Sequence, residues 1–400
     1  MSEFEKDQTL PDGTIVGNRF KIVQKLGEGG CGSVFKVEDL ENQNQPCAMK
    51  VEYNTTTNGN VLKMEVQILQ ALTTKKHVAK LIFSGKKTEF SYMVMTLLGD
   101  SLSSLISKHG PYFNVSTQTR IGISLLFGVK QIHDSGYIHR DLKPANIALG
   151  YKGGEDERYF LVLDFGLARK YVSEVEGKLA LRRPRERALF RGTARYCSMA
   201  MHEREDQGRV DDLWAMMYIL AELRCRLPWA DFGEKQDILS SKKKTVDDVL
   251  FSKSPLQLLE FANEVRKLNY YDRPDYEKLF SILNDIMKQA DFKWSDPYHW
   301  EPQVKLSAEK RKQSKEPEKQ EKVPDKKTGS TRRKTAAVAQ VHSGSDKQRK
   351  SSRSRRNKKK SSDGEKRATT PKKNLLTDTT ATPDVPYFTS DDFKSNPIGF

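Results

Sequence analysis

The chain has 400 residues, of which 69 are Lys or Arg and 53 are Asp or Glu, giving a formal net charge of +16. The four cysteines are far apart and form no CxxC pair, so the sequence indicates neither a disulfide framework nor a zinc site, and a reducing compartment fits best. The polar, acidic start is unlike a signal peptide, and no apolar run reaches the ~20 residues of a membrane helix. We therefore expect no transmembrane segment and a cytoplasmic protein, with the nucleus as a second location.

The first predicted elements build a small lobe that is rich in strands. Residues 1–18 are assigned to an N-terminal extension. Apolar and polar residues then alternate within residues 19–52, which predicts three strands with a glycine-rich turn between the first two. Residues 61–72 have the apolar spacing of a helix, and residues 80–84 and 90–95 are predicted to be two more strands.

The pattern becomes helical after residues 96–99, which we assign as the hinge between two lobes. Short strands are expected at 147–149 and 160–163, and segments with helical periodicity lie at 117–135, 210–223, 256–268 and 276–290. The predicted fold class is α+β, with a small β-rich lobe (19–95) that carries one main helix and a larger, mainly helical lobe (100–300). A crevice between two such lobes is a usual place for a ligand.

The composition changes abruptly after Pro302. Residues 301–400 hold 26 basic and 13 acidic residues and few large apolar ones. Such a segment buries too little apolar surface to offset its ordering entropy, so we predict a disordered basic tail rich in Ser, Lys and Arg. Its basic stretches 331–334 and 352–360 fit a polyanionic partner such as nucleic acid, anionic lipid or a microtubule surface, and a merely solubilising tail explains them equally well.

A glycine-rich loop is the first candidate binding element. Gly27, Gly29 and Gly32 have GxGxxG spacing between two predicted strands. Glycines let main-chain N–H groups approach phosphates closely, although an ordinary glycine-rich turn has the same pattern. A dinucleotide-binding loop would run from a strand into a helix, and this one runs from strand to strand.

Two charged residues follow the loop at positions that suit phosphate binding. Lys50 lies on the third predicted strand, where a lysine is otherwise a solvated edge charge. Glu65 lies on the following helix and faces inward by its spacing from Ile68. We predict that Glu65 pairs with Lys50 and holds it toward phosphate oxygens. An exposed helix charge is the alternative for Glu65.

The most concentrated chemistry is in YIHRDLKPANIAL (137–149). Asp141 can accept the proton of an incoming hydroxyl, Lys143 can stabilise the charge of a transferring phosphoryl group, and Asn146 can bind a metal ion. Asp164, in LDFGLA, can hold a magnesium ion that bridges nucleotide phosphates. Phosphoryl transfer requires mainly positioning and charge neutralisation, which these groups supply.

Taken in order, the three glycines, Lys50, Glu65, HRDLKPAN and DFG resemble the eukaryotic protein kinases over roughly residues 19–300. GTARY, VDDLWAMMYIL and LPW are similar to the casein kinase I group, and FRGTARY, DDLW and PYHWE are most similar to its tau-tubulin kinase branch. The resemblance implies ATP and Mg2+, with Mn2+ as a possible substitute, and serine/threonine specificity from Lys143. It also implies a gatekeeper at Met95, a buried brace at Asp212, and ATP-contacting residues at Leu26, Gly27, Glu28, Gly29, Gly30, Cys31, Gly32, Ser33, Val34, Lys50, Glu65, Met95, Thr96 and Leu98.

The sequence departs from the family pattern in two places. The tip of the glycine loop is Cys31, where the group often has an aromatic residue. Ser198-Met199-Ala200 replaces the usual Ala-Pro-Glu, which removes the customary glutamate partner of Arg273. Neither change removes a catalytic group.

A run of arginines between Asp164 and GTARY is the candidate substrate patch. It consists of Arg182, Arg183, Arg185, Arg187 and Arg191. Guanidinium groups favour phosphate and carboxylate, which predicts substrates with acidic or already phosphorylated residues near the target hydroxyl. A solvated basic loop is the alternative. By the same resemblance, Thr193 belongs to the substrate loop near Asp141 rather than to an activating phosphosite.

Two functions compete on this sequence. The first is a monomeric serine/threonine protein kinase that transfers the ATP γ-phosphate to protein substrates. The alternative is a pseudokinase scaffold whose basic tail binds a polyanionic partner. All five polar residues that phosphoryl transfer requires are present, which favours the enzyme.

Overall fold

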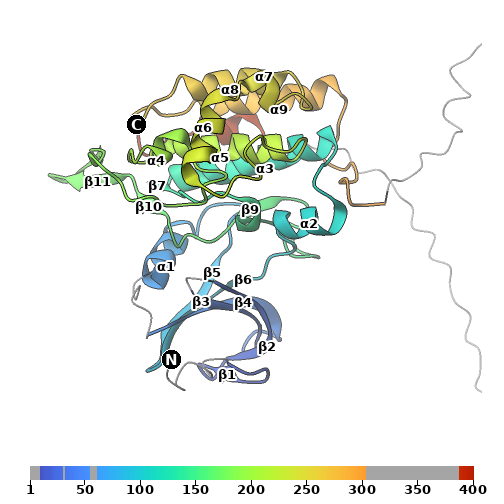
Figure 1. Ribbon diagram of the computed structural model, residues 1–400. Coiled ribbons are helices and arrows are strands. Elements are labelled where there is room, and N and C mark those ends of the chain that lie inside the picture. Colours follow the sequence, from blue (N-terminus) through green and yellow to red (C-terminus); the bar gives the residue numbers. More distant parts are fainter. Residues whose placement is uncertain (1–9, 30–31, 55–60, 303–386) are drawn as a thin grey trace, which may run out of the picture. The chain divides into compact units, whose positions relative to one another are not determined.

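The computed structural model describes residues 10–29, 32–54, 61–302 and 387–400. Its first lobe contains one antiparallel sheet of order β1-β2-β3-β4-β6-β5, drawn mainly in blue in Figure 1. The strands are β1 (Ile15–Val16), β2 (Phe20–Gly29), β3 (Gly32–Asp39), β4 (Gln45–Tyr53), β5 (Leu81–Lys86) and β6 (Phe90–Thr96). Because β1 pairs with β2, the lobe begins before residue 19, and the predicted boundary of the N-terminal extension at residue 18 is corrected.

Alternating side chains explain the core of this sheet. Along β3, buried residues alternate with partly exposed ones, so Phe35 and Val37 face inward with Phe20 of β2 and Met49 of β4. The one helix among the described residues of this lobe, α1 (Val61–Ala71), buries Leu62, Glu65, Ile68 and Leu69 and packs on β5 and β6. The helix predicted at 61–72 is therefore confirmed.

The second lobe is mainly helical, as predicted. Its helices are α2 (Leu102–His109), α3 (Val115–His133), α4 (Met199–His202), α5 (Arg209–Glu222), α6 (Lys235–Lys244), α7 (Asp247–Leu250), α8 (Gln257–Arg266) and α9 (Tyr276–Gln289). Helix α3 starts where the Asn114 side chain accepts a hydrogen bond from the Thr117 main-chain N–H. Within the described residues, no helix combines the length and the apolar character needed to cross a membrane.

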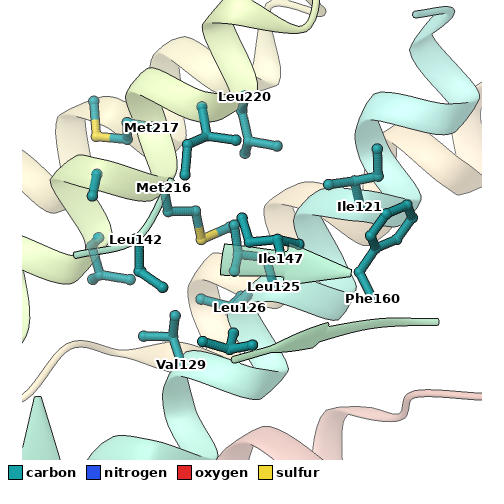
Figure 2. Packing of buried hydrophobic residues seen from close by; sticks show 14 of the residues in the cluster. Ile121, Leu125, Leu126, Val129, Leu142, Ile147, Phe160, Met216, Met217 and Leu220 are labelled. Carbon is teal, nitrogen blue, oxygen red and sulfur yellow. The ribbon is translucent and has the colours of Figure 1, made fainter. Parts of the chain in front are cut away.

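The core of the helical lobe forms around α3, which is buried at almost every position. Figure 2 shows Leu125 and Val129 of α3 near Met216 of α5, with Leu142 and Ile147 among them. Leu142 lies one residue after Asp141, so residues 139–146, the predicted catalytic loop, are anchored by buried apolar side chains. Burial of an aliphatic side chain of this size contributes about 1.5–3 kcal/mol to folding.

Short elements connect the core to the loop that carries the charged motif. β7 (Tyr137–Ile138) pairs with β10 (Arg169–Lys170), and β8 (Ile147–Leu149) pairs with β9 (Phe160–Val162). The 3-10 turn η2 (Pro144–Asn146) lies between β7 and β8. A further hairpin is formed by β11 (Val172–Val175) and β12 (Lys178–Leu181). These pairings fix both ends of residues 139–146.

The end of the chain corrects one prediction. Residues 387–400 contain α10 (Ser390–Lys394) and belong to the same compact unit as residues 10–302. Phe388 and Phe393 are buried, because aromatic side chains of α3 and α9 surround them. The predicted tail of residues 301–400 was therefore wrong for residues 387–400, whereas residues 303–386 lie outside the part that the structure describes.

Candidate active site

The catalytic loop is held from behind by one buried carboxylate. Asp212, at the start of α5, accepts hydrogen bonds from the main-chain N–H groups of His139 (2.7 Å) and Arg140 (2.8 Å). His133 Nε2 lies 2.9 Å from the same carboxylate. Although burial alone would raise the pKa of Asp212, these partners lower it. The brace stabilises Arg140 in the left-handed region, at φ 69°, a conformation that costs a non-glycine residue about 1–3 kcal/mol.

Three predicted residues meet within this loop. Lys143 Nζ lies 2.7 Å from Asp141 Oδ2, and Asn146 Nδ2 donates to the Asp141 main-chain oxygen at 2.9 Å. On the other side, the Thr193 hydroxyl donates to Asp141 Oδ1 at 2.8 Å. The Asp141 carboxylate is thus positioned between a cation and a hydroxyl group.

A second cluster joins the two lobes. Lys50 Nζ on β4 lies 2.6 Å from Glu65 of α1 and 3.0 Å from Asp164. Burial would lower the pKa of Lys50, but the two carboxylates outweigh it and raise this pKa, so Lys50 is charged. For Asp164, burial would raise the pKa, and Lys50 lowers it. The ion pair predicted between Lys50 and Glu65 is present.

Main-chain contacts bring the two clusters together. The Leu163 N–H donates to the Asn146 oxygen at 3.0 Å, which places Asp164 directly beside the metal-binding candidate of the loop. Glu65 Oε1 accepts from the Phe165 N–H at 3.1 Å, so α1 contacts the DFG segment as well as Lys50. Asp164 itself has φ 65°, a second left-handed residue held by its surroundings.

The described residues of the glycine-rich stretch belong to the end of β2 and the start of β3. Leu26, Gly27, Glu28 and Gly29 are exposed, whereas Ser33 is buried and Val34 partly buried. Gly32 has φ 111°, and a Cβ built there would lie 1.9 Å from the Val51 oxygen, so only glycine fits. Gly30 and Cys31, also predicted to contact ATP, lie outside the described residues.

The predicted gatekeeper and hinge lie at the end of β6. Met95 is paired with Ala48 of β4, and the Thr96 hydroxyl accepts a hydrogen bond from the Lys80 N–H at 2.9 Å. Leu98 is partly exposed just after the strand. The Gly99 N–H donates to the Leu149 oxygen at 2.8 Å, which fixes the hinge to β8 of the second lobe.

The predicted arginine patch is only partly assembled into one cluster. Arg182, Arg183, Arg185, Arg187 and Arg191 are all exposed residues. Arg185 and Arg169 both pair with Asp206, at 2.7 and 2.8 Å. Burial together with the positive charges of Arg169, Arg185 and Arg191 lowers the pKa of Arg140 to about 10. Arg140 therefore lies in surroundings that Arg169, Arg185 and Arg191 make positive and that Asp206 partly neutralises.

Sequence reasoning missed the residues that support the substrate loop. Lys242 of α6 is buried and donates to the main-chain oxygens of Ala194 (2.8 Å) and Cys197 (2.6 Å). Its ammonium also lies 4.7 Å from the centre of the Tyr218 ring. Lys242 is one of three consecutive lysines, so its neighbours carry no signal that distinguishes it. Asp206 was missed for a similar reason, because its arginine partners are distant in sequence.

Asp164 and Asn146 fit a divalent cation. The Asp164 side chain is 37% exposed, and Asn146 uses its amide nitrogen to hold the Asp141 main chain. A carboxylate and an amide oxygen are hard ligands, and a cation such as Mg2+ takes its remaining ligands from water and phosphate. No group of three or more His, Cys, Asp or Glu side chains suited to a metal occurs among the described residues. The donor set therefore suits a nucleotide-bound cation rather than an all-protein metal cage.

Comparison with known proteins agrees with this geometry. The family model for the protein kinase domain matches residues 20–283. A putative serine/threonine-protein kinase of Caenorhabditis elegans is 64% identical over 75% of this chain and 86% of its own length. A protein of the same organism named as an inactive tau-tubulin kinase is 34% identical over 60% of this chain and 86% of its own.

A more distant relative is a casein kinase I homolog of Kluyveromyces lactis, 30% identical over 75% of this chain and 56% of its own length. Protein kinases as a family use ATP and a divalent metal to modify protein substrates. The chain therefore belongs to the protein kinase family, among relatives named serine/threonine-protein kinase, casein kinase I and tau-tubulin kinase.

Proposed function

We propose that this chain is a catalytically active serine/threonine kinase that transfers the γ-phosphate of Mg2+-ATP to hydroxyl groups of protein substrates. The observation that supports this most is the hydrogen bond from the Thr193 hydroxyl to Asp141 Oδ1 at 2.8 Å. A threonine hydroxyl already lies where the hydroxyl of a substrate would have to lie for Asp141 to orient it.

In the proposed reaction, the substrate oxygen attacks the γ-phosphorus as its bond to the β,γ-bridging oxygen breaks, and ADP leaves. Asp141 orients the hydroxyl and accepts its proton, which then passes to solvent. Lys143, whose ammonium lies 2.7 Å from Asp141, stabilises the negative charge of the transferring group. Lys50, held by Glu65, positions the phosphates of the nucleotide.

Asp164 and Asn146 would hold the metal. When bound, Mg2+ neutralises charge on the phosphate oxygens. The glycine loop from Leu26 to Val34 would cover the phosphates with main-chain N–H groups. Met95, Thr96 and Leu98 would line the adenine site next to the hinge.

A casein phosphorylation assay with radiolabelled ATP and Mg2+ tests the proposal. Wild-type protein should transfer phosphate to Ser or Thr, and Asp141→Asn should lower kcat by about 10³-fold or more, since orientation and proton transfer both fail. Circular dichroism and the melting temperature should stay close to wild type. If Asp141→Asn and wild type had equal kcat, Asp141 could not be the catalytic group.

The arginines beside the catalytic loop support a preference for acidic or phosphorylated substrates. Arg191 and Arg185 both contribute to the positive surroundings of Arg140. Peptides that carry phosphoserine or Asp near the target should therefore have a higher kcat/KM than neutral peptides of the same length. Arg191→Gln should lower kcat/KM for the acidic or phosphorylated peptides and leave kcat/KM for the neutral peptides unchanged. Equal kcat/KM for all peptides would remove the preference.

A pseudokinase scaffold stays the second candidate, because one relative is named inactive. The intact cluster of Lys50, Glu65 and Asp164 favours the enzyme. Three further points stay predictions: a monomeric state, a cytoplasmic or nuclear location, and binding of a polyanion through residues 331–334 and 352–360. Those two basic stretches lie outside the described residues.

A further inference from the structure

Residues 387–400, called here the docked segment, are anchored on the helical lobe by two phenylalanines. Phe393 is fully buried and stacks on Phe280 of α9, with ring centres 4.3 Å apart and planes at 10°. Phe388 is 3% exposed and lies 5.0 Å from the ring of Phe127 on α3. Figure 1 shows this segment in red among the helices of this lobe. Aromatic side chains that are fully buried against a facing surface are the usual anchors of a specific docking contact.

Polar contacts fix the position of the segment beyond these anchors. Lys130 of α3 donates to the Ser395 hydroxyl at 2.7 Å, and Arg273 donates to the Ser395 main-chain oxygen at 2.8 Å. Arg209 of α5 donates to the Phe400 main-chain oxygen at 3.1 Å. The docked segment therefore supplies a main-chain acceptor to Arg273 and a hydroxyl acceptor to Lys130.

The far end of the docked segment touches the support of the catalytic loop. Ile398 and Phe400 pack against a small cluster made of Ile138, Tyr171 and Val172. Ile138 directly precedes His139, the first of the two residues whose N–H groups bond to Asp212. The segment therefore covers the strand β7 from which the catalytic loop starts.

A path of one cation–π contact and two polar contacts runs from the same place to Asp212. The Arg209 guanidinium lies 4.9 Å from the centre of the Tyr171 ring. The Tyr171 hydroxyl donates to the His133 main-chain oxygen at 2.8 Å, and His133 Nε2 lies 2.9 Å from Asp212. Every side chain in this path is buried or partly buried, so a displacement of Arg209 would also displace Tyr171 and the groups that contact it.

We propose that the docked segment acts in cis as a positioning element, which raises kinase activity by bracing β7 and the Asp212 network in the conformation that holds Asp141. The occupant of this surface is the chain's own residues 387–400, since they already fill its aromatic pockets and engage Lys130, Arg209 and Arg273. The role rests on the proposed kinase function. None of its residues touches the reacting atoms, so none is a catalytic residue.

A chain that ends at residue 386 tests the proposal. Its kcat should fall about fivefold or more, the size expected of a coupling between two distant sites, with little change in the KM for ATP. Adding a synthetic peptide of residues 387–400 should restore kcat, and the same peptide with Phe393→Ala should not. A matched deletion of residues 310–323 removes the same length from elsewhere and should keep full activity.

Point variants in the full chain protect the test against misfolding of the shortened chain. Phe393→Ala should lower kcat and be rescued by the peptide, whereas Asp391→Asn, whose side chain is 85% exposed, should match wild type. Suppose that the shortened chain melts at a lower temperature than wild type and still has the wild-type kcat at a temperature where both are folded. That result would make the segment merely structural and would overturn the proposal. Activity that falls when the full-length protein is diluted would overturn docking in cis in favour of a second copy. An inactive full-length protein would instead refute the kinase function itself.

Discussion

Single buried charges in this protein are compensated by specific partners. Asp212 takes two main-chain N–H groups and a histidine, and Lys50 takes two carboxylates. Removing one partner of such a buried set typically costs 3–5 kcal/mol, since an uncompensated charge is left behind. The positions of these groups are therefore tightly specified, which is what a site for phosphoryl transfer requires.

Gly32 should tolerate no side chain. Its φ of 111° and the 1.9 Å approach of a built Cβ to the Val51 oxygen predict that Gly32→Ala lowers the free energy of unfolding by at least about 1–3 kcal/mol. Gly29→Ala is the matched control, because nothing lies within 4 Å of its Cβ. Urea unfolding of the two variants measures the difference. Equal stability would show that β3 can shift away from β4.

The ion pairs of Asp206 with Arg169 and Arg185 should make the free energy of unfolding depend on pH. Although burial would raise the pKa of Asp206, hydrogen bonds from Arg185 and charge from Arg169 lower it from 3.8 to about 2. A lowered carboxyl pKa contributes stability that is complete above the unfolded value and is lost as the pH falls through the folded value. Asp206→Asn should thus be about 2 kcal/mol less stable than wild type at pH 7, and the gap should close between pH 4 and 2. Urea titrations across this range measure the gap; a gap that does not change with pH would contradict the assignment.

Among the elements, helix α6 contacts the loop after Thr193 through the side chain of Lys242. Lys242 has no carboxylate partner among the described residues, and it is held by two main-chain oxygens, by Tyr218 and by Trp229. Burial lowers the pKa of Lys242 to about 8. A lysine buried at this cost indicates that the loop carbonyls of Ala194 and Cys197 need its donors.

Lys242→Met should therefore disturb the loop more than the neighbouring substitution Lys243→Met. The Cys197 oxygen would lose its ammonium donor and the Ala194 oxygen would be left with the His202 ring at 3.2 Å, which predicts a fall in kcat/KM for the protein substrate of about tenfold, with the KM for ATP unchanged. Lys243 is exposed and, within the part of the chain that the structure describes, pairs with Glu203, which is also exposed, so Lys243→Met should behave as wild type. Steady-state kinetics with varied peptide measure both. Similar effects of the two substitutions would rule out a special role for Lys242.

The elements differ in how well their sequences predict them. Strands β2 to β6 of the first lobe and helices α1, α3, α5, α8 and α9 were predicted from their own apolar periodicity, whereas β1, within the supposed N-terminal extension, was not. Helix α6 was missed because its sequence, KQDILSSKKK, is mostly polar, and α10 because Phe388 and Phe393 stand in a polar context. The burial of these two aromatics depends on α3 and α9, which are distant in sequence.

For the whole molecule, the motif order located the candidate site but not its supports. Lys50, Glu65, Asp141, Asn146 and Asp164 could be predicted from short motifs, because phosphoryl transfer restricts the residue types and their order. The Asp206 arginine pairs, the Lys242 contacts and the docked segment could not, since each depends on tertiary neighbours that no local pattern specifies. The residues proposed to act on the phosphates can thus be predicted from the sequence more readily than the residues that position them.

The central claim is that groups from both lobes form a single site for Mg2+-ATP. Thermal unfolding with a non-hydrolysable ATP analogue, with and without Mg2+, tests this claim most directly. Wild-type protein should gain roughly 2.7 kcal/mol of stability at a ligand concentration a hundred times the Kd, and Asp164→Asn should lose the Mg2+-dependent part of the gain. No stabilisation of wild type, or an equal Mg2+-dependent gain in Asp164→Asn, would contradict the account.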